Sequence, residues 1–457
     1  MATETWTGET CPHGYPVEFK TECPQCRIRK ESGPKAPTGE KKIPPPPPGS
    51  AERKAFERQK LAEEQEISEI KKEISGEEAG IEKEPGGKNI FAATEKDAEK
   101  TKNQDAIAAG ENYVLVADGL GGHIGGYEAS HTVADYVRDT FEEKKQSIEP
   151  ILKSGNQENI ERLVAGIING AQEEVAEAVE ENPDLRGMGT TLTMALKWET
   201  PIEKKFGGLI KKGGEKKVTL GQVGDSRAYR FRDGALERVT KDDSIAQKLV
   251  DQGIFPDDQS TEVRYSINEL MPKILEVRKK EALDQGYQWT SELEKLIKDN
   301  VGRSLGIIET APKLIAQGHY RENEQGQKEA LFSINEIKRG TDSSITSDRE
   351  NLRSGKVLTI DAKKGDLLLV CSDGLTDMVR DKSINEILNK YQDNYEKAAE
   401  MLVIAAKIMC GQKNIEDYPE LQDVLEVEKD NGKIKIAKGA KEWAKGHDDV
   451  AVGIEVI

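Results

Sequence analysis

Four aspartates stand where apolar, strand-like segments begin or end. They are Asp118 after YVLVA, Asp225 after LGQVG, Asp373 after LLLVCS, and Asp448 directly before the final DVAVGIEVI. If strands bring these carboxylates together at one edge, their mutual repulsion requires cations. Oxygen ligands without matching histidine or cysteine favour Mg²⁺ or Mn²⁺ over zinc. Taken singly, an aspartate before glycine is more often a turn former, so the prediction depends on the four together.

Alternating strand-like and helix-like segments must position these acids. Apolar alternation predicts strands at 113–118, 190–198, 217–225, 227–231, 356–361, 366–373 and 449–457. Helical spacing predicts helices at 126–145, 157–181, 383–390 and 394–410. Several strands alternate as antiparallel strands do when one face is covered, so we expect a layered α+β domain.

The composition limits the kinds of partner. The chain has 457 residues and a formal net charge of −17, which argues against nucleic acid or an anionic membrane as the main partner. The sequence has neither a run of roughly 20 apolar residues nor a signal-peptide pattern. Five cysteines are too few for a disulfide framework in a chain this long. We therefore expect a soluble, cytoplasmic protein.

The first 85 residues differ from the rest of the chain in amino-acid composition. Residues 1–30 carry a Cys-x-His pair and a Cys-x-x-Cys pair, made by Cys11, His13, Cys23 and Cys26. Four such ligands suit a structural zinc knuckle, and an unstructured tail bearing thiols is the alternative. Residues 31–50 form a proline-rich linker. Residues 51–85 hold a charged helix and a second linker; the helix is expected to be mostly solvated, with partner docking or a coiled coil as alternatives.

A series of motifs extends the pattern of the aspartates. In order they are KTKNQD (100–105), VADGLGGH (116–123), GMGTTLTMAL (187–196), VGDSRAYRFRDGALERVTKDDS (223–244), VGRSLG (301–306), GDLLLVCSDGLTDMV (365–379) and GHDDVAV (446–452). This set resembles the PPM family of Mg²⁺/Mn²⁺-dependent serine/threonine protein phosphatases in its bacterial form, over about residues 86–457. The resemblance implies a four-layer α-β-β-α sandwich, in which two antiparallel sheets are flanked by helix pairs and a two-metal site lies at one edge.

The resemblance also assigns metal ligands. Asp118 matches the aspartate that bridges both metals, and Gly119 matches the glycine whose carbonyl binds the second metal. Asp373 and Asp448 match the remaining carboxylates of the first metal, and Asp105 an acid that supports the site through water. A looser third-metal site would add Asp225 and Asp377 to the shared Asp373.

The implied reaction is hydrolysis of phosphoserine and phosphothreonine by direct attack of a metal-bridging hydroxide. Phosphorylated proteins would be the substrates, and a Ser/Thr kinase the opposing enzyme. Lys100 occupies the place of a phosphate-binding arginine, so it keeps the charge but loses the bidentate fork. Phosphate affinity is then weaker, or comes partly from another group.

Several positions depart from the family pattern. Some relatives have a proton-donating histidine where this chain has Leu120, and His123 is expected to be structural or to act through other residues. Gln104 and Asp243 replace a common glutamate and histidine. Cys371 has no arginine loop of the kind cysteine phosphatases need, so we expect a buried core residue.

Two stretches are longer than the family requires. An enlarged flap at about 254–300 contains helical segments, and a second insertion follows at about 307–355. The flap is expected to be folded and to form a lid or a docking surface. Two other functions remain open, namely a catalytically weak or inactive phosphoprotein-binding regulator, and an adaptor that works through the N-terminal segments.

Overall fold

The structure is a computed structural model. It describes residues 81–87, 89–120, 124–205, 210–212, 214–256, 263–284, 286–304, 307–316, 318–323, 326–332, 344–346, 355–430, 433–437 and 448–457, within a compact unit spanning Ala79–Ile457. The predicted zinc ligands Cys11, His13, Cys23 and Cys26, the predicted linker and charged helix up to residue 80, and His123 lie outside these residues. No helix of the described part combines the length and apolar character needed to cross a membrane.

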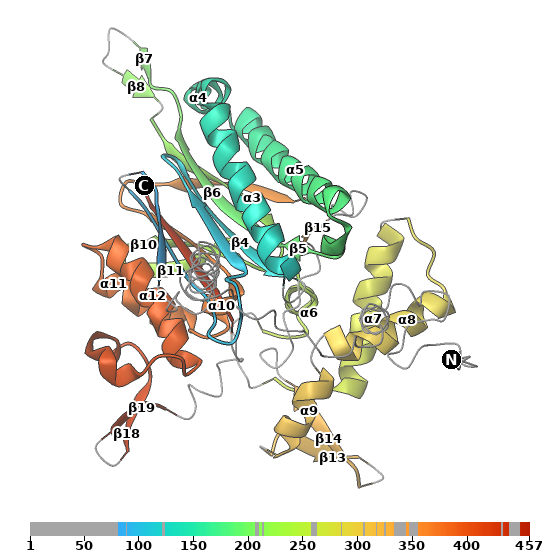
Figure 1. Cartoon of the computed structure of the whole chain (residues 1–457). Helices are drawn as coiled ribbons and strands as arrows, with labels where there is room; N and C mark the ends of the chain where they lie inside the picture. Colours follow the sequence, from blue (N-terminus) through green and yellow to red (C-terminus); the bar gives the residue numbers. More distant parts are fainter. Residues whose placement is uncertain are drawn as a thin grey trace, which may run out of the picture. The chain divides into compact units, whose positions relative to one another are not determined.

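Two antiparallel sheets form the centre of the molecule (Figure 1). The six-stranded sheet runs in the order β1 (Glu82–Pro85), β2 (Ile90–Glu95), β20 (Val450–Val456), β17 (Leu367–Cys371), β10 (Arg227–Arg232) and β11 (Ala235–Arg238). The seven-stranded sheet runs β15 (Ile345–Thr346), β5 (Gly189–Thr190), β4 (Tyr113–Leu120), β6 (Leu192–Glu199), β9 (Lys216–Val223) and β16 (Lys356–Ala362), with β3 (Asp105–Ala109) paired to β4.

Successive side chains of a strand point to opposite faces of its sheet, and those on the inner faces fill the space between the sheets. In β20, Ala451 belongs to the core between the sheets, whereas Val452 and Ile454 face the helices on the other side. Gly453 lets the sheets approach closely, because a Cβ there would lie 2.4 Å from the Val114 Cγ2. The strict period of two therefore places one apolar face of each sheet inside the sandwich.

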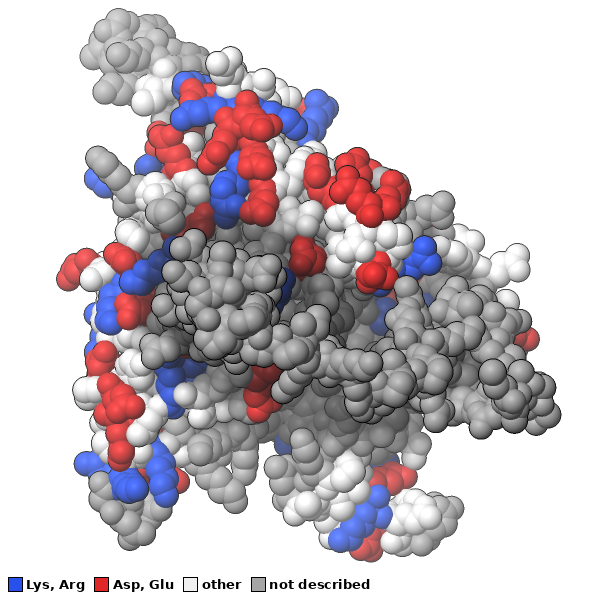
Figure 2. Space-filling view, in the orientation of Figure 1, with Lys and Arg blue, Asp and Glu red and all other residues white. Residues whose placement is uncertain are grey.

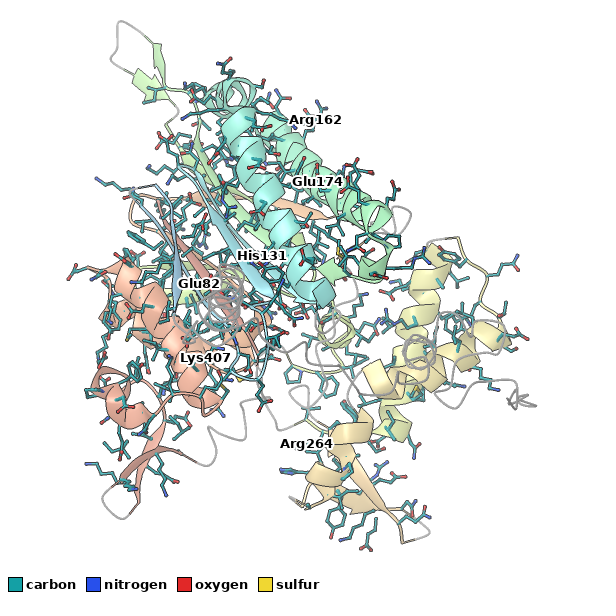
Figure 3. All side chains as sticks on the ribbon, in the orientation of Figure 1. Glu82, His131, Arg162, Glu174, Arg264 and Lys407 are labelled. Carbon is teal, nitrogen blue, oxygen red and sulfur yellow. The ribbon has the colours of Figure 1, made fainter. Side chains whose placement is uncertain are left out.

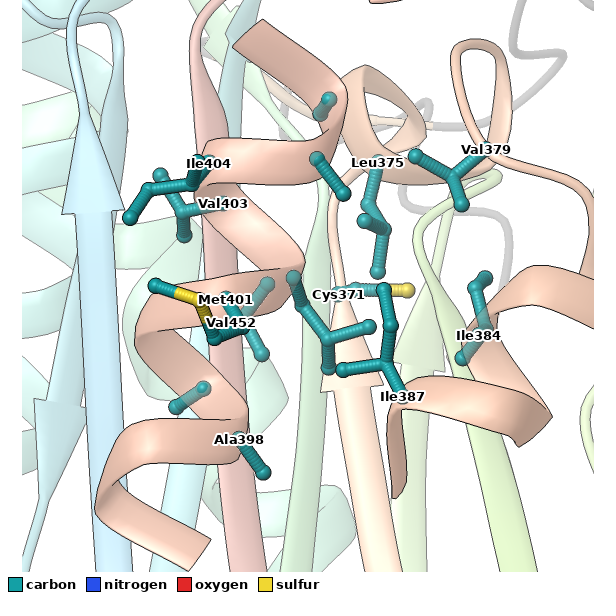
Figure 4. Packing of buried hydrophobic residues seen from close by; sticks show 14 of the residues in the cluster. Cys371, Leu375, Val379, Ile384, Ile387, Ala398, Met401, Val403, Ile404 and Val452 are labelled. Carbon is teal, nitrogen blue, oxygen red and sulfur yellow. The ribbon is translucent and has the colours of Figure 1, made fainter. Parts of the chain in front are cut away.

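Helices cover the outer face of each sheet. α3 (Ile124–Glu143), α4 (Lys145–Ser154) and α5 (Gln157–Glu181) share a buried cluster with the seven-stranded sheet. α10 (Asp373–Thr376), α11 (Asp381–Lys390) and α12 (Tyr395–Met409) share another with the six-stranded sheet, where Cys371 lies beside Leu375 and Ile387 (Figure 4). The predicted four-layer α-β-β-α sandwich is confirmed.

Element boundaries differ from the predictions near the aspartates. The predicted strand 190–198 is two strands, β5 and β6, because the Thr191 N–H leaves the ladder and donates to the carbonyl of Asp118 at 2.8 Å. The predicted strand ends at 225 and 373 are wrong, since β9 ends at Val223 and β17 at Cys371. The predicted helix 126–145 begins at Ile124 and ends at Glu143, and α4 follows it.

A folded subdomain begins just before the predicted flap and continues through the flap and into the second insertion. Its elements are α6 (Ile245–Asp251), β12 (Tyr265–Ser266), α7 (Ile267–Asp284), α8 (Ser291–Ser304), α9 (Ile307–Ala316), β13 (Tyr320–Glu322) and β14 (Lys328–Phe332). Buried Leu249, Phe255, Ile274 and Phe332 give it a core of its own. The helices expected in the flap are thus present.

Short elements complete the described part. They are the 3-10 helices η2 (Pro183–Leu185), η6 (Ile415–Asp417) and η7 (Pro419–Leu421), and the hairpins β7 (Glu203–Lys205) with β8 (Ile210–Lys212) and β18 (Val427–Asp430) with β19 (Lys433–Ile436). Acidic and basic side chains lie side by side over the described surface in Figure 2. Exposed pairs such as Arg162–Glu158 on α5 contribute little to stability, so the buried clusters hold the fold.

One acid is buried inside the sandwich. Glu455 of β20 is 0 % exposed, and its carboxylate lies 3.3 Å from the Lys197 ammonium of β6 in the opposite sheet. Burial raises the pKa of Glu455 to about 8, although Lys197 partly opposes the rise.

This buried acid predicts a pH-dependent stability. Between the ordinary pKa of 4.5 and the folded value of about 8, the folded chain holds a proton that the unfolded chain has released, so stability falls as pH rises. Glu455→Gln is expected to flatten that fall, as measured by urea unfolding with EDTA at several pH values. The exposed Glu199→Gln serves as the control. An unchanged pH slope in Glu455→Gln would contradict this account.

Candidate active site

Strands β3 and β4 bring two aspartates together. Their antiparallel register places Asp105 directly opposite Asp118, and residues so paired lie close enough for their side chains to interact. β4 continues to Leu120, so Asp118 lies within the strand rather than at its end. Gly119 donates its N–H to the carbonyl of Gln104 at 2.9 Å. A Cβ on Gly119 would lie 2.0 Å from the carbonyl oxygen of Gly126, so the start of α3 requires a glycine here.

The six-stranded sheet delivers the other acids to the same end of the sandwich. Cys371 of β17 pairs with Arg227 of β10 and with Val452 of β20. The residues just beyond this row are Asp225, Asp373 and Asp448. Asp373 begins the single turn of α10, and the N–H of Asp377 donates to its carbonyl at 2.7 Å. This turn places Asp373 and Asp377 on one helix face.

Hydroxyl groups connect the two sheets at this edge. Ser372 Oγ donates to Asp105 Oδ2 at 2.6 Å, and the N–H of Ala451 donates to Ser372 Oγ at 3.0 Å. The N–H of Asp118 donates to Thr191 Oγ1 at 3.0 Å, and that hydroxyl lies 2.7 Å from Ser226 Oγ. Serine and threonine side chains therefore fix the backbone from which the aspartates project.

The aspartates influence one another electrostatically. Burial raises the pKa values of Asp105, Asp118 and Asp225 well above their ordinary range, and neighbouring acids raise them further. For Asp118 these neighbours are Asp105, Asp373 and Asp448, and the Asp373 carboxyl group has the additional effect of a polar neighbour. The site thus concentrates negative charge that protons or cations must compensate.

Lys100 supplies one positive charge at the site. Its ammonium lies 2.6 Å from Asp448 Oδ1 and 2.9 Å from Asp449 Oδ2. Burial alone lowers the pKa of Lys100, but the two carboxylates outweigh it and raise the pKa overall. For Asp448, burial has the opposite effect and raises the pKa of the carboxyl group, whereas the charge of Lys100 lowers it. Lys100 is therefore a permanent cation beside a predicted metal ligand.

Asp449 is a site residue that the sequence reasoning missed. Its carboxylate is fully buried and accepts the N–H groups of Asp97 at 2.6 Å and of Gln104 at 2.7 Å, in addition to Lys100. The Asp-Asp pair in GHDDVAV could have indicated it, but the position directly before the final strand-like segment drew attention to Asp448 alone. Asp449 ties the segment that carries Lys100 to the start of β20.

The loop that carries Asp225 is fixed by a buried ion pair. Gly224 has a φ of 98°, and its carbonyl accepts the N–H of Asp243 at 3.0 Å. The Arg227 guanidinium donates to both carboxylate oxygens of Asp242, at 2.8 and 2.6 Å. Because Arg227 is 2 % exposed, this bidentate pair holds the turn between β9 and β10 in one position.

The prediction for Cys371 has a clear outcome, and Asp243 has an ionic neighbour. Cys371 is fully buried in the helix-covered core, as predicted, and burial raises the pKa of its thiol, which disfavours the reactive thiolate. Asp243, which replaces the common histidine, lies 3.7 Å from the Lys248 ammonium of α6.

The donor set fits hard divalent cations, although it is not arranged around one. Among the described residues, no group of three or more His, Cys, Asp and Glu side chains already has metal-binding geometry. The ammonium of Lys100 engages Asp448. The clustered donors are carboxylate oxygens, which Mg²⁺ and Mn²⁺ prefer. Divalent cations would supply the positive charge that Lys100 alone does not provide to the whole cluster.

The family model "Protein phosphatase 2C" matches residues 94–407, and the chain belongs to this family. The family resemblance inferred from the motifs is thereby confirmed.

Two curated relatives and one solved structure are similar to parts of this chain. The serine/threonine protein phosphatase PstP of Mycobacterium tuberculosis is 33 % identical over 177 residues, which cover 38 % of this chain and 29 % of PstP. The match therefore spans less than a third of that relative. The serine/threonine phosphatase stp of Listeria monocytogenes is 24 % identical over 302 residues, covering 66 % of this chain and 81 % of stp. The crystal structure of M. tuberculosis PstP/Ppp shares 20 % identity with a TM-score of 0.44, covering 80 % of this chain and 97 % of that one.

The close packing at the site predicts the effect of one added methyl group. A Cβ on Gly374 would lie 1.8 Å from the carbonyl oxygen of Asp449, so Gly374→Ala must displace the backbone beside Asp373. We expect a loss of about 1–3 kcal/mol in the free energy of unfolding, as for other overpacked sites. Gly166→Ala in α5 is the matched control, because its Cβ meets nothing within 4 Å. It should gain about 0.5–1 kcal/mol. Urea denaturation in EDTA measures both, and equal stability of the two variants would refute the packing argument.

Proposed function

We propose that this chain is a metal-dependent protein serine/threonine phosphatase that hydrolyses phosphoserine and phosphothreonine. The observation that carries the proposal is the convergence of aspartates from both sheets, with Asp105 opposite Asp118, and with Asp373 and Asp448 close enough to influence Asp118 electrostatically. The phosphatase names of the PstP and stp relatives support it. The predicted phosphoprotein substrates, an opposing Ser/Thr kinase and a cytoplasmic location belong to the same proposal.

The proposed metal site uses the residues predicted from the motifs. Two Mn²⁺ or Mg²⁺ ions would be held by Asp118, the Gly119 carbonyl, Asp373 and Asp448, with Asp105 in support, and Asp225 and Asp377 would be available to a third ion. Such ions lower the pKa of bound water and neutralise phosphoryl oxygens. The chain's own contribution is to hold these carboxylates rigidly, through Ser372 and Thr191, before substrate arrives.

Lys100 is proposed to contact the substrate phosphate. It is about a quarter exposed at the side chain, is charged at neutral pH, and stands beside Asp448. A single ammonium donates to a phosphoryl oxygen as a point charge, without the planar fork of arginine.

The domain division also remains a proposal. It comprises a zinc knuckle at 1–30, a linker at 31–50, a charged helix and linker at 51–85, and a phosphatase domain at 86–457 with insertions at about 254–300 and 307–355. Structural Zn²⁺ bound by Cys11, His13, Cys23 and Cys26 is part of this division.

A phosphothreonine peptide tests the activity directly. With Mn²⁺ we expect phosphate release that EDTA abolishes and that Asp118→Asn lowers by more than the roughly 10–100-fold typical of losing an outer partner of a metal ligand. Asp361→Asn is the matched control, because Asp361 is an exposed aspartate of β16 whose side chain is 85 % accessible. Activity that persists in EDTA or in Asp118→Asn would exclude the metal mechanism. A folded wild-type chain that binds the peptide without releasing phosphate would instead support the regulator or adaptor alternative.

Substitution of Lys100 tests its role in phosphate binding. Loss of a charge-assisted hydrogen bond of about 1.5–3 kcal/mol predicts a KM for phosphopeptide roughly 10–100-fold higher in Lys100→Met. Lys100→Arg should keep a KM near or below the wild-type value, since it adds the bidentate fork. Steady-state kinetics at saturating Mn²⁺ separate KM from kcat. An unchanged KM in Lys100→Met would show that Lys100 serves only its acidic neighbours.

A further inference from the structure

A lysine is buried behind the candidate site. Lys407 lies near the end of α12, as Figure 3 shows, and is 0 % exposed within an otherwise apolar helix face. Burial lowers the pKa of Lys407, and nearby acids oppose the effect. A buried ammonium is costly unless it is paired and hydrogen-bonded, so its contacts indicate why it is there.

The ammonium of Lys407 reaches the backbone of a predicted metal ligand. Its Nζ donates to the carbonyl oxygen of Asp448 at 2.9 Å. Its charge interacts with Asp97, Glu95 and Asp449, which are all nearly or fully buried. Among these acids, Asp449 follows Asp448 directly and accepts the N–H of Asp97 at 2.6 Å. Lys407 is thus anchored on the backbone that carries Asp448.

The path of the chain shows why Asp448 needs such a contact. The chain leaves α12 after Met409 and returns to the sheet only at Val450, after the η6, η7 and β18–β19 elements. The ends of so long a connection come together at an entropic cost. The carbonyl of Lys407 accepts the N–H groups of Gln412 at 2.9 Å and Lys413 at 3.0 Å, where the connection departs. One residue therefore holds both the departing and the returning chain.

We propose that Lys407 is a positioning residue for the metal centre. Its ammonium fixes the Asp448 backbone, so that the Asp448 carboxylate is held where a divalent cation can use it. This inference rests on the proposed metal-dependent function. The outer partners of metal ligands commonly affect affinity by about 10–100-fold.

Calorimetric titration of the full chain with Mn²⁺ alone tests the proposal. Lys407→Met keeps the length of the side chain without its charge and is expected to weaken Mn²⁺ binding at least about tenfold, whereas Lys407→Arg should lie between it and the wild type. Lys397→Met is the matched control on the same helix, since Lys397 pairs with Glu400 at the surface. At saturating Mn²⁺, the KM for phosphopeptide should be similar in all four proteins, because Lys407 does not face the substrate.

A second measurement needs no variant. Coupling between Mn²⁺ and Lys407 is reciprocal, so Mn²⁺ should slow hydrogen exchange in the last turn of α12 of the wild-type chain. Folded Lys407→Met with wild-type Mn²⁺ affinity would overturn the proposal. If Lys407→Met does not fold, unchanged exchange in α12 while the exchange of β4 slows would overturn it. A wild-type chain that binds no Mn²⁺ would instead refute the metal-dependent function itself.

Discussion

The structure depends on one constraint, which is the gathering of many carboxylates at one edge of the sandwich. Carboxylates in a low-dielectric interior repel strongly and favour protonation. Burial and neighbouring carboxylates raise the pKa of Asp118. Neighbouring carboxylates also raise the pKa of Lys100, against the effect of burial, so both shifts reflect the same excess of negative charge. The fold tolerates this excess because most of the acids are anchored by strands or by backbone N–H groups, as for Asp449. An arrangement so costly without compensation is well suited to binding cations.

Close backbone contacts make the arrangement rigid. Gly119 and Gly374 follow Asp118 and Asp373 directly, and at each glycine a Cβ would meet a carbonyl oxygen within 2.0 Å. The backbone beside these acids therefore packs on neighbouring backbone rather than on side chains that can rotate. Interiors packed in this way resist small displacements, which suits carboxylates that must share ions.

The layers of the fold and most of the clustered aspartates could be predicted from the sequence. The buried contact that Lys407 makes with the backbone of Asp448 could not. Period-two and helical spacing predicted β20 and α5 because each element buries one face. Asp118 and Asp373 were predicted because each follows an apolar, strand-like segment and belongs to the ordered set of motifs. Nothing local marked Lys407, whose partner Asp448 is 41 positions away and whose neighbours on α12 are apolar. Contacts that depend on the return of a long connection leave no periodic signal.

The inserted subdomain is joined to the site at both of its ends. It departs at Ser244, which caps α6 by accepting the N–H of Gln247 and follows the Arg227–Asp242 ion pair beside Asp225. It returns through β15, where Ile345 pairs with Thr190, the residue whose hydroxyl donates to the carbonyl of Asp118 at 2.9 Å. Gln172 of α5 further holds this return by hydrogen bonds to Thr346. Both attachment points lie beside backbone that carries proposed ligands. A movement of the subdomain would therefore be transmitted to the carboxylate cluster at two places. A subdomain connected in this way can affect the geometry of the acids without supplying a ligand, as Lys407 does from behind.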